Sequence, residues 1–366
     1  MEIPGPNPTY RWDVYDSRKN NVSGHVECHY TIQNGSWTEP KFVESPSLQV
    51  HGLAPGLHYG QQVYEGILAR RTPDNDILIF RPASNGSRMA RSAVAVSMPS
   101  VPEPLFLKAV HMAVALNAEY VPPYDFPGSL YIRPFQFGSG CQIGLEPPDE
   151  FTFCVFVQPH IAFHGHTTLR ALIAEDFDRA ATRGTGNVKV GGNYAPVIKW
   201  SREAKKVENG AWDVLLHVDS QSQTCVDEFS TSGFVGIICP IKDKDQEQVP
   251  TVVIPDSMAA IDSITSDSVV KLARSFGWQV IKRAVRIHEL GNFTEVLAVG
   301  TAAGILSVKE IHRASTRETF SFVPEGPYCH RLREALVGMQ KGQLEDSFGW
   351  CEKLRYADFK KMTATL

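Results

Sequence analysis

The character of the apolar runs changes near residue 160, and this change limits the possible folds more than any other feature of the chain. Before it, short strand-like runs at 24–30, 76–82 and 151–159 accompany one stretch with helical spacing at 104–120. Such a mixture is typical of an α+β domain. Residues 161–188 are rich in Gly, Thr, His and Arg and show little periodicity, which indicates a connecting segment.

The second half of the chain alternates strand-like and helix-like segments. The runs at 212–218, 233–240 and 295–304 are short and apolar, as buried strands are, whereas 267–278 and 330–340 have helical spacing. At 366 residues the chain is long enough for two domains. We therefore predict domains at 1–160 and 183–366, joined by a linker at 161–182.

Composition excludes several classes of protein. The formal net charge is −4, which argues against a nucleic-acid partner, because nucleic-acid binders present a basic face. No run approaches the ~18 apolar residues of a membrane span, and the start, MEIPGPNPTYRWD, has no apolar signal region or basic presequence. The seven cysteines include no CxxC pair, which indicates a reducing compartment. We expect a cytoplasmic, soluble enzyme with no membrane partner.

Motifs for metals and nucleotides are missing or incomplete. His25 and Glu27 form an HxE, but no PCxxC follows, and the segment alternates like a strand. His164 and His166 form a loop pair without further ligands. Neither a GxGxxG nor a GxxxxGK[ST] motif occurs. We expect no metal site.

The segment RGTGNVKVGGNYAPVIKW at 183–200 holds the strongest candidate for chemistry. Lys189 lies among small and apolar residues and is followed by two glycines, and a helix is expected from Asn193 to about Lys206. Poor solvation disfavours the charged ammonium, so the lysine pKa falls and its amine can attack an aldehyde. A surface lysine near a helix start is the alternative that composition alone leaves open.

The motif KVGGNYAP resembles the lysine motif of the branched-chain amino acid aminotransferases, which are class IV, fold-type IV pyridoxal-phosphate enzymes. The resemblance extends in order from HYGQQVYEG at 58–66 to GPYCHRLREALVGMQKGQLEDSFGWC at 326–351, and VDEFSTSGF at 226–234 is similar to the fungal branch. It implies an α+β, two-domain fold: a small α+β domain and a larger domain with a barrel-like β core. It also implies a homodimer.

The same resemblance implies roles in binding pyridoxal 5′-phosphate. Lys189 matches the lysine that holds the cofactor as a Schiff base and moves the substrate proton. Glu228 matches the carboxylate facing the pyridine nitrogen, which keeps the ring able to accept electrons. Arg88, rather than its neighbour Arg91, matches the arginine on the phosphate. The other implied cofactor contacts are Tyr194, Ile264, Thr265 and Thr301.

The implied substrate pocket is aromatic, with hydroxyl groups and one arginine. Such a pocket can admit both glutamate and an apolar amino acid. Its matching positions are Tyr59, Tyr64, Tyr131 and Arg133, with the backbone of Ala302 near the substrate carboxylate. Tyr64 stands where the family often has phenylalanine.

The activity implied is a reversible, ping-pong transamination between a branched-chain or related apolar L-amino acid and 2-oxoglutarate, so its partners are small amino and 2-oxo acids. The alternatives are a D-amino acid or (R)-amine transaminase, an aminodeoxychorismate lyase-like enzyme, or a specialised aminotransferase of secondary metabolism. A non-catalytic relative is disfavoured because Lys189 and Glu228 are both present. Three positions depart from the family pattern: Ser263, Ser266 and Gly233.

Overall fold

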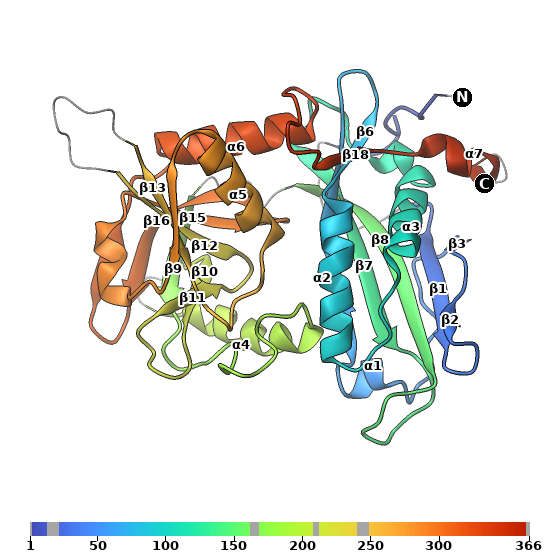
Figure 1. Cartoon of the computed structure of the whole chain (residues 1–366), viewed down its shortest axis with the longest axis horizontal. Coiled ribbons are helices and arrows are strands. Elements are labelled where there is room, and N and C mark those ends of the chain that lie inside the picture. Colours follow the sequence, from blue (N-terminus) through green and yellow to red (C-terminus); the bar gives the residue numbers. More distant parts are fainter. Residues whose placement is uncertain (1, 13–21, 162–167, 208–211, 240–248, 364–366) are drawn as a thin grey trace. The chain divides into compact units, whose positions relative to one another are not determined.

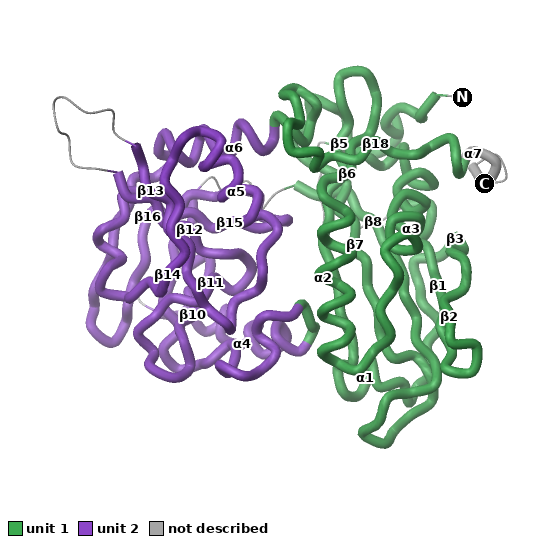
Figure 2. Tube along the Cα trace, viewed as in Figure 1, with its two compact units in different colours: residues 1–162, 189–191, 338–366 green, residues 163–188, 192–337 purple. Residues whose placement is uncertain are grey.

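The computed structural model describes residues 2–12, 22–161, 168–207, 212–239 and 249–363. The chain forms two compact units, each built from separate stretches of sequence (Figure 2). Unit 1 comprises residues 1–162, 189–191 and 338–366, and unit 2 comprises residues 163–188 and 192–337.

Unit 1 is built on an antiparallel sheet with nine strands among the described residues, in the order β18-β6-β5-β7-β8-β1-β2, with β3 on β1 and β4 on β7 (Figure 1). The strands are β1 (His25–Thr31), β2 (Ser36–Trp37), β3 (Lys41–Val43), β4 (Gln62–Tyr64), β5 (Ile67–Arg71), β6 (Ile77–Phe80), β7 (Gly128–Gly138), β8 (Glu150–Ile161) and β18 (Cys351–Lys353). The helices are α1 (Pro55–His58), α2 (Pro82–Ala95), α3 (Glu103–Ala115), the 3₁₀ turn η1 (Ala118–Tyr120) and α7 (Tyr356–Thr363).

Helix α3 packs on this sheet through an apolar face. Phe106 of α3 stacks on Phe153 of β8, with ring centroids 5.7 Å apart, and both rings are buried. Burying a phenylalanine side chain contributes about 1.5–3 kcal/mol, so contacts of this kind fix the helix to the strands. The long β7–β8 ladder, from Gly128↔Ile161 to Gly138↔Phe151, gives the sheet its frame.

Unit 2 holds a mixed sheet, also with nine described strands, in the order β11-β10-β9-β16-β15-β12-β13-β14, with β17 on β16. The strands are β9 (Thr168–Ile173), β10 (Val214–Val218), β11 (Val226–Phe229), β12 (Gly233–Ile238), β13 (Thr251–Pro255), β14 (Gln279–Arg283), β15 (Glu295–Gly300), β16 (Gly304–Arg313) and β17 (Glu318–Ser321). The helices are η3 (Gly191–Asn193), α4 (Ala195–Ala204), α5 (Ile264–Ser275), η5 (Ile287–Asn292) and α6 (Pro327–Gln340).

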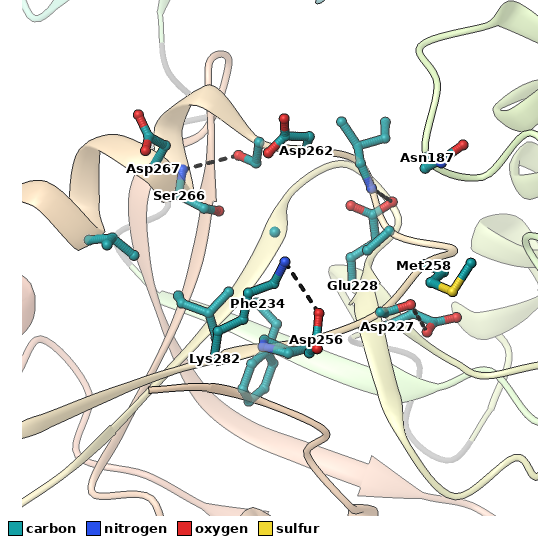
Figure 3. Close-up of a pocket in the computed structure, with 18 of the residues that line it drawn as sticks. Asn187, Asp227, Glu228, Phe234, Asp256, Met258, Asp262, Ser266, Asp267 and Lys282 are labelled. Atoms are coloured by element: carbon teal, nitrogen blue, oxygen red, sulfur yellow. Dashed lines mark hydrogen bonds and ion pairs between the residues drawn. The ribbon is translucent and has the colours of Figure 1, made fainter. Parts of the chain in front are cut away.

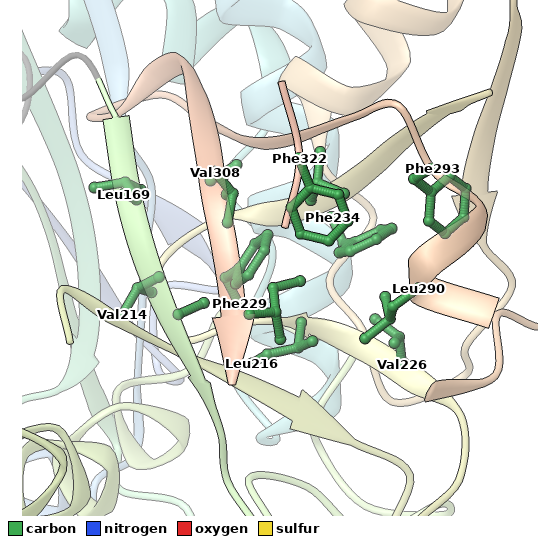
Figure 4. Packing of buried hydrophobic residues seen from close by; sticks show 14 of the residues in the cluster. Leu169, Val214, Leu216, Val226, Phe229, Phe234, Leu290, Phe293, Val308 and Phe322 are labelled. Atoms are coloured by element: carbon green, nitrogen blue, oxygen red, sulfur yellow. The ribbon is translucent and has the colours of Figure 1, made fainter. Parts of the chain in front are cut away.

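The two ends of this strand order meet, which closes the sheet. Val226 of β11 donates its N–H to the carbonyl of Val285, 2.8 Å away, and Ile287 donates to Thr224 at 2.9 Å, just after β14. Inside lies an apolar cluster that includes Leu216, Phe229, Phe234 and Val308 (Figure 4). The predicted barrel-like β core of the larger domain is confirmed.

The compact units differ from the predicted domains in three places, the shortest of which is 189–191, a stretch of the predicted larger domain that belongs to unit 1. The predicted linker at 161–182 contains β9, which lies inside the unit 2 sheet between β10 and β16, so its backbone is paired rather than free. Residues 338–366, assigned to the larger domain, belong to unit 1, because β18 pairs with β6. The histidine pair His164 and His166 lies outside the described residues.

Candidate active site

Lys189 lies in a three-residue stretch that the chain contributes to unit 1. Its carbonyl accepts the N–H of Tyr64 at 3.2 Å, and Val190 forms an isolated antiparallel bridge with Val63. Its own N–H donates to Oγ of Ser92 on α2, 2.9 Å away. Its Nζ lies 4.6 Å from the centre of the Tyr64 ring. The lysine motif is therefore held alongside strand β4 by a short antiparallel pairing.

Three residues predicted to bind substrate contact one another, and the ring of Tyr64 links them to that lysine. The Arg133 guanidinium lies 4.8 Å from the Tyr64 ring centre and 5.3 Å from that of Tyr131, and its Nη2 is 3.3 Å from the Tyr131 hydroxyl. Gly66 makes room for this hydroxyl, because a Cβ at Gly66 would lie 2.0 Å from it. Amine, guanidinium and two phenols thus form one cluster in unit 1.

Tyr59, the fourth predicted substrate aromatic, makes a different contact. It follows α1, is 48% exposed, and donates its hydroxyl to the carbonyl of Ile143 at 2.5 Å. This bond ties the loop after α1 to the loop that contains Ile143.

Arg88 lies on α2 with its side chain buried. Its Nε and Nη2 contact Oε1 and Oε2 of Glu65 at 2.8 and 2.7 Å, which is a bidentate pair. Glu65 is fully buried, so the pair is shielded from water. The competing candidate, Arg91, is exposed on the same helix. The guanidinium predicted to hold a phosphate is therefore fixed in orientation by a carboxylate.

Glu228 lies on β11 in unit 2 and is 5% exposed. Its Oε1 is 2.6 Å from Nη2 of Arg179 and accepts the N–H of Ile261 at 3.4 Å, and the latter contact is visible in Figure 3. Nη2 of Arg179 also donates to the carbonyls of Gly186 and Ala259, at 3.2 and 2.5 Å. A guanidinium this close favours the charged form of a buried carboxylate, which is the form that the predicted role of Glu228 requires.

Two titratable neighbours of this ion pair are perturbed by burial. Burial, with a smaller contribution from the Arg179 charge, lowers the pKa of His217 to about 3, so its imidazole is neutral. Burial also raises the pKa of Asp227, although Ser257 donates its hydroxyl to Oδ1 at 2.5 Å. Neutral His217 adds no second cation beside Glu228.

A pocket of about 600 Å³ in unit 2 extends from Glu228 to the start of α5 (Figure 3). The three residues that depart from the family pattern all line it. Ser263 is the N-cap of α5, and its hydroxyl accepts the N–H of Ser266 at 3.1 Å. The absence of a side chain at Gly233 leaves room for the Ser266 hydroxyl, because a Cβ at Gly233 would lie 2.6 Å from it.

The remaining predicted cofactor contacts lie at element ends in unit 2. Ile264 and Thr265 are the first two residues of α5, where backbone N–H groups lack partners within the helix. Thr301 and Ala302 form the turn between β15 and β16. Tyr194 is the N-cap residue of α4. Each occupies a position from which backbone or hydroxyl donors can reach a ligand.

Sequence reasoning missed three residues that hold the predicted groups: Arg179, Glu65 and Ser92. Arg179 lay in the segment interpreted as a linker, so no pattern pointed to it. Glu65 stands inside HYGQQVYEG, directly after Tyr64, and Ser92 lies one helical turn after Arg88. Ser92 could have been found by asking which side chains share a helix face with Arg88.

Comparisons with known proteins identify the family of the chain. Residues 62–311 match the family model described as amino-transferase class IV. Aminotransferase TOXF of Cochliobolus carbonum is 66% identical over 359 residues, covering 98% of this chain and 99% of the relative. Aminotransferase poxL of Penicillium oxalicum is 46% identical over 344 residues, covering 93% and 92%.

Solved structures give the same fold. A branched-chain amino acid aminotransferase of Escherichia coli superposes with a TM-score of 0.73 at 24% identity, covering 92% of this chain and 100% of the other. The enzyme of Thermobaculum terrenum in its PLP form gives 0.71 at 20% identity, covering 92% and 99%. The chain belongs to the class IV aminotransferases, and its fold is that of fold type IV.

Pyridoxal 5′-phosphate is the cofactor of this family, and the residues present fit it. Unit 1 supplies a primary amine at Lys189 and a buried guanidinium at Arg88. Unit 2 supplies a buried carboxylate at Glu228 and the N-terminus of α5. Within unit 1, the amine suits an aldehyde and the guanidinium suits a phosphate; within unit 2, the carboxylate suits a protonated ring nitrogen and the helix N-terminus suits a phosphate. Among the described residues, no cluster of His, Cys, Asp and Glu suits a metal, and no helix is long and apolar enough to cross a membrane.

Proposed function

We propose that this aminotransferase moves an amino group between a branched-chain or related apolar L-amino acid and 2-oxoglutarate, in a reversible, ping-pong reaction. The observation that carries the proposal is the cluster of Lys189, Tyr64, Tyr131 and Arg133. An exposed guanidinium flanked by phenol rings can bind the side-chain carboxylate of glutamate. The same rings offer apolar surface to an aliphatic side chain.

Each predicted cofactor-binding residue has a different part in the proposed reaction. When bound, the cofactor accepts the electron pair released at the substrate Cα. Lys189 takes the Cα proton and returns it, since its Nζ is the basic group of the motif. Glu228, which is paired with Arg179, stabilises positive charge on the ring nitrogen. Arg88 holds the phosphate, and the start of α5 supplies further N–H donors.

A panel of amino donors with 2-oxoglutarate tests this proposal. L-Leucine, L-isoleucine and L-valine should be consumed with formation of L-glutamate, and their D-forms should not. Preferential use of a D-amino acid or an (R)-amine would select the other fold-type IV activities. Release of pyruvate from aminodeoxychorismate without glutamate formation would select the lyase.

The second candidate is a specialised aminotransferase of secondary metabolism. It is supported by relatives that are fungal aminotransferases at 66% and 46% identity, against 20–24% for the branched-chain enzymes of known structure. The pocket residues Ser263, Ser266 and Gly233 depart from the family pattern, and Tyr64 stands where the family often has phenylalanine. Long-chain and oxidised aliphatic amino acids in the same panel separate the two, because a specialised enzyme should prefer them to L-leucine.

We also propose a cytoplasmic homodimer. Light scattering of the purified protein measures the oligomeric state directly, and a monomer mass would contradict it. Fluorescent tagging at the C-terminus, with the natural start of the chain intact, tests the compartment.

A further inference from the structure

Helix α2 carries two residues that face the predicted chemistry, one turn apart. Arg88 pairs with Glu65, and Ser92, four residues later, accepts the backbone N–H of Lys189 at 2.9 Å. Residues four apart lie on one face of a helix. Ser92 is 1% exposed, so its hydroxyl lies in the interior of unit 1 and is shielded from water.

The backbone of Lys189 is bonded on both sides. Its carbonyl accepts from the backbone of Tyr64, and its N–H donates to Ser92. Only the second bond depends on a side chain. Two glycines follow in the sequence after Val190, and glycine leaves the backbone unusually free. The Ser92 hydroxyl therefore restrains the backbone of the lysine at its N–H, whereas β4 restrains it at its carbonyl.

We propose that Ser92 is a positioning residue for Lys189: its hydroxyl fixes the backbone from which the reactive amine projects, and so fixes the reach of that amine. This inference rests on the proposed function, in which Lys189 is the nucleophile and proton carrier. A small misplacement of a catalytic group can cost about a hundredfold in rate. Loss of the hydroxyl should therefore lower kcat more than it changes KM.

The test compares Ser92→Ala with Ser87→Ala in the holoenzyme. Ser87 lies on the same helix but is exposed, so it controls for the loss of a serine hydroxyl from α2. Alanine is a better helix former than serine, so the helix should persist in both variants. We expect Ser92→Ala to lower kcat by about ten- to a hundredfold with the best donor of the panel. Ser87→Ala should behave as the parent enzyme.

A spectroscopic readout separates positioning from packing. The visible absorbance of the lysine-bound cofactor should titrate at a different pH in Ser92→Ala, because the amine is held less firmly. Ser92→Thr, which keeps the hydroxyl, should recover the parental titration and most of kcat. Equal losses in Ser92→Ala and Ser92→Thr with an unchanged titration would assign Ser92 to packing and overturn the inference.

Borohydride trapping followed by peptide mapping distinguishes the two levels of proposal. If the pyridoxyl tag is found on a residue other than Lys189, the proposed function fails at its nucleophile. If the tag is on Lys189 and Ser92→Ala matches Ser87→Ala in kcat and titration, the inference about Ser92 fails while the proposed function stands.

Discussion

Arg179 and Glu228 form a buried ion pair, with Nη2 and Oε1 2.6 Å apart and side chains only 3% and 7% exposed. Removing one partner of such a pair leaves a charge without water or a counterion. We expect Arg179→Ala to lower the free energy of unfolding by about 3–5 kcal/mol. Urea unfolding of the cofactor-free protein measures this change.

Arg183→Ala is the matched control for that prediction, since Arg183 lies in the same loop but is exposed. Surface substitutions of this kind usually change stability by no more than about 0.5 kcal/mol. Equal unfolding midpoints for the two variants would show that Glu228 finds another partner.

The buried pair of Arg88 and Glu65 predicts different outcomes for single and double variants. Arg88→Met alone should destabilise unit 1 by about 3–5 kcal/mol, because it leaves the buried Glu65 carboxylate without its counterion. Arg88→Met with Glu65→Gln removes both charges and should restore much of that stability. Cofactor affinity should fall in both, by about ten- to a hundredfold, for a lost charge-assisted bond of about 1.5–3 kcal/mol.

Arg91→Met is the control for cofactor affinity. Arg91 was the competing candidate for the phosphate and is exposed on the same helix. Fluorescence titration with pyridoxal 5′-phosphate should give a dissociation constant near that of the parent chain. A larger loss of cofactor affinity in Arg91→Met than in the double variant would show that Arg91, and not Arg88, binds the phosphate.

His217 predicts a loss of stability in mild acid. Its pKa in the folded chain is about 3, through burial and then the Arg179 charge, against an ordinary value of 6.5. Below pH 6.5 the His217 imidazole therefore binds a proton in the unfolded chain but not in the folded chain. The free energy of unfolding falls as the pH drops through this range. Between pH 6.5 and 5 this linkage amounts to roughly 1.5 kcal/mol.

Replacing His217 by glutamine should remove that part of the pH dependence. Urea unfolding at both pH values measures it, and His288→Gln, at an exposed position of the same unit, is the control. A pH dependence identical in His217→Gln and His288→Gln would mean that His217 is protonated in the folded chain.

We expect substitutions at Gly233 and Ser266 to have coupled effects on the free energy of unfolding. Gly233→Ala would bring a Cβ to 2.6 Å from the Ser266 hydroxyl and should destabilise unit 2. Ser266→Gly removes that hydroxyl, so the double variant should recover stability. A double-mutant cycle should give a coupling of about 0.5–3 kcal/mol. Additive effects would show that the two positions are not coupled energetically.

Much of the fold could be predicted from the sequence because local patterns and tertiary burial agree. The apolar run at 151–159 is the centre of β8, and the helical spacing at 330–340 lies within α6. The segment 161–182 could not be predicted: β9 is only six residues long, and its pairing with β10 and β16 is set by distant parts of the chain.

The candidate site divides in the same way. Lys189 and Glu228 could be proposed from the sequence because the motif that contains each of them is contiguous. Arg179 was not, because its role depends on 2.6 Å of separation from a residue 49 positions later (228 − 179 = 49), which no local pattern encodes. The N-cap of α5 is Ser263, one of the positions first noticed only as a departure from the family pattern.

Strand β18 has a consequence for how the protein is made. It is the edge partner of β6, yet its residues, Cys351–Lys353, follow the whole of unit 2 in the chain. A ribosome must release nearly the entire polypeptide before the first sheet acquires its last strand. Neither unit can therefore be inherited, excised or exchanged as one uninterrupted piece of gene.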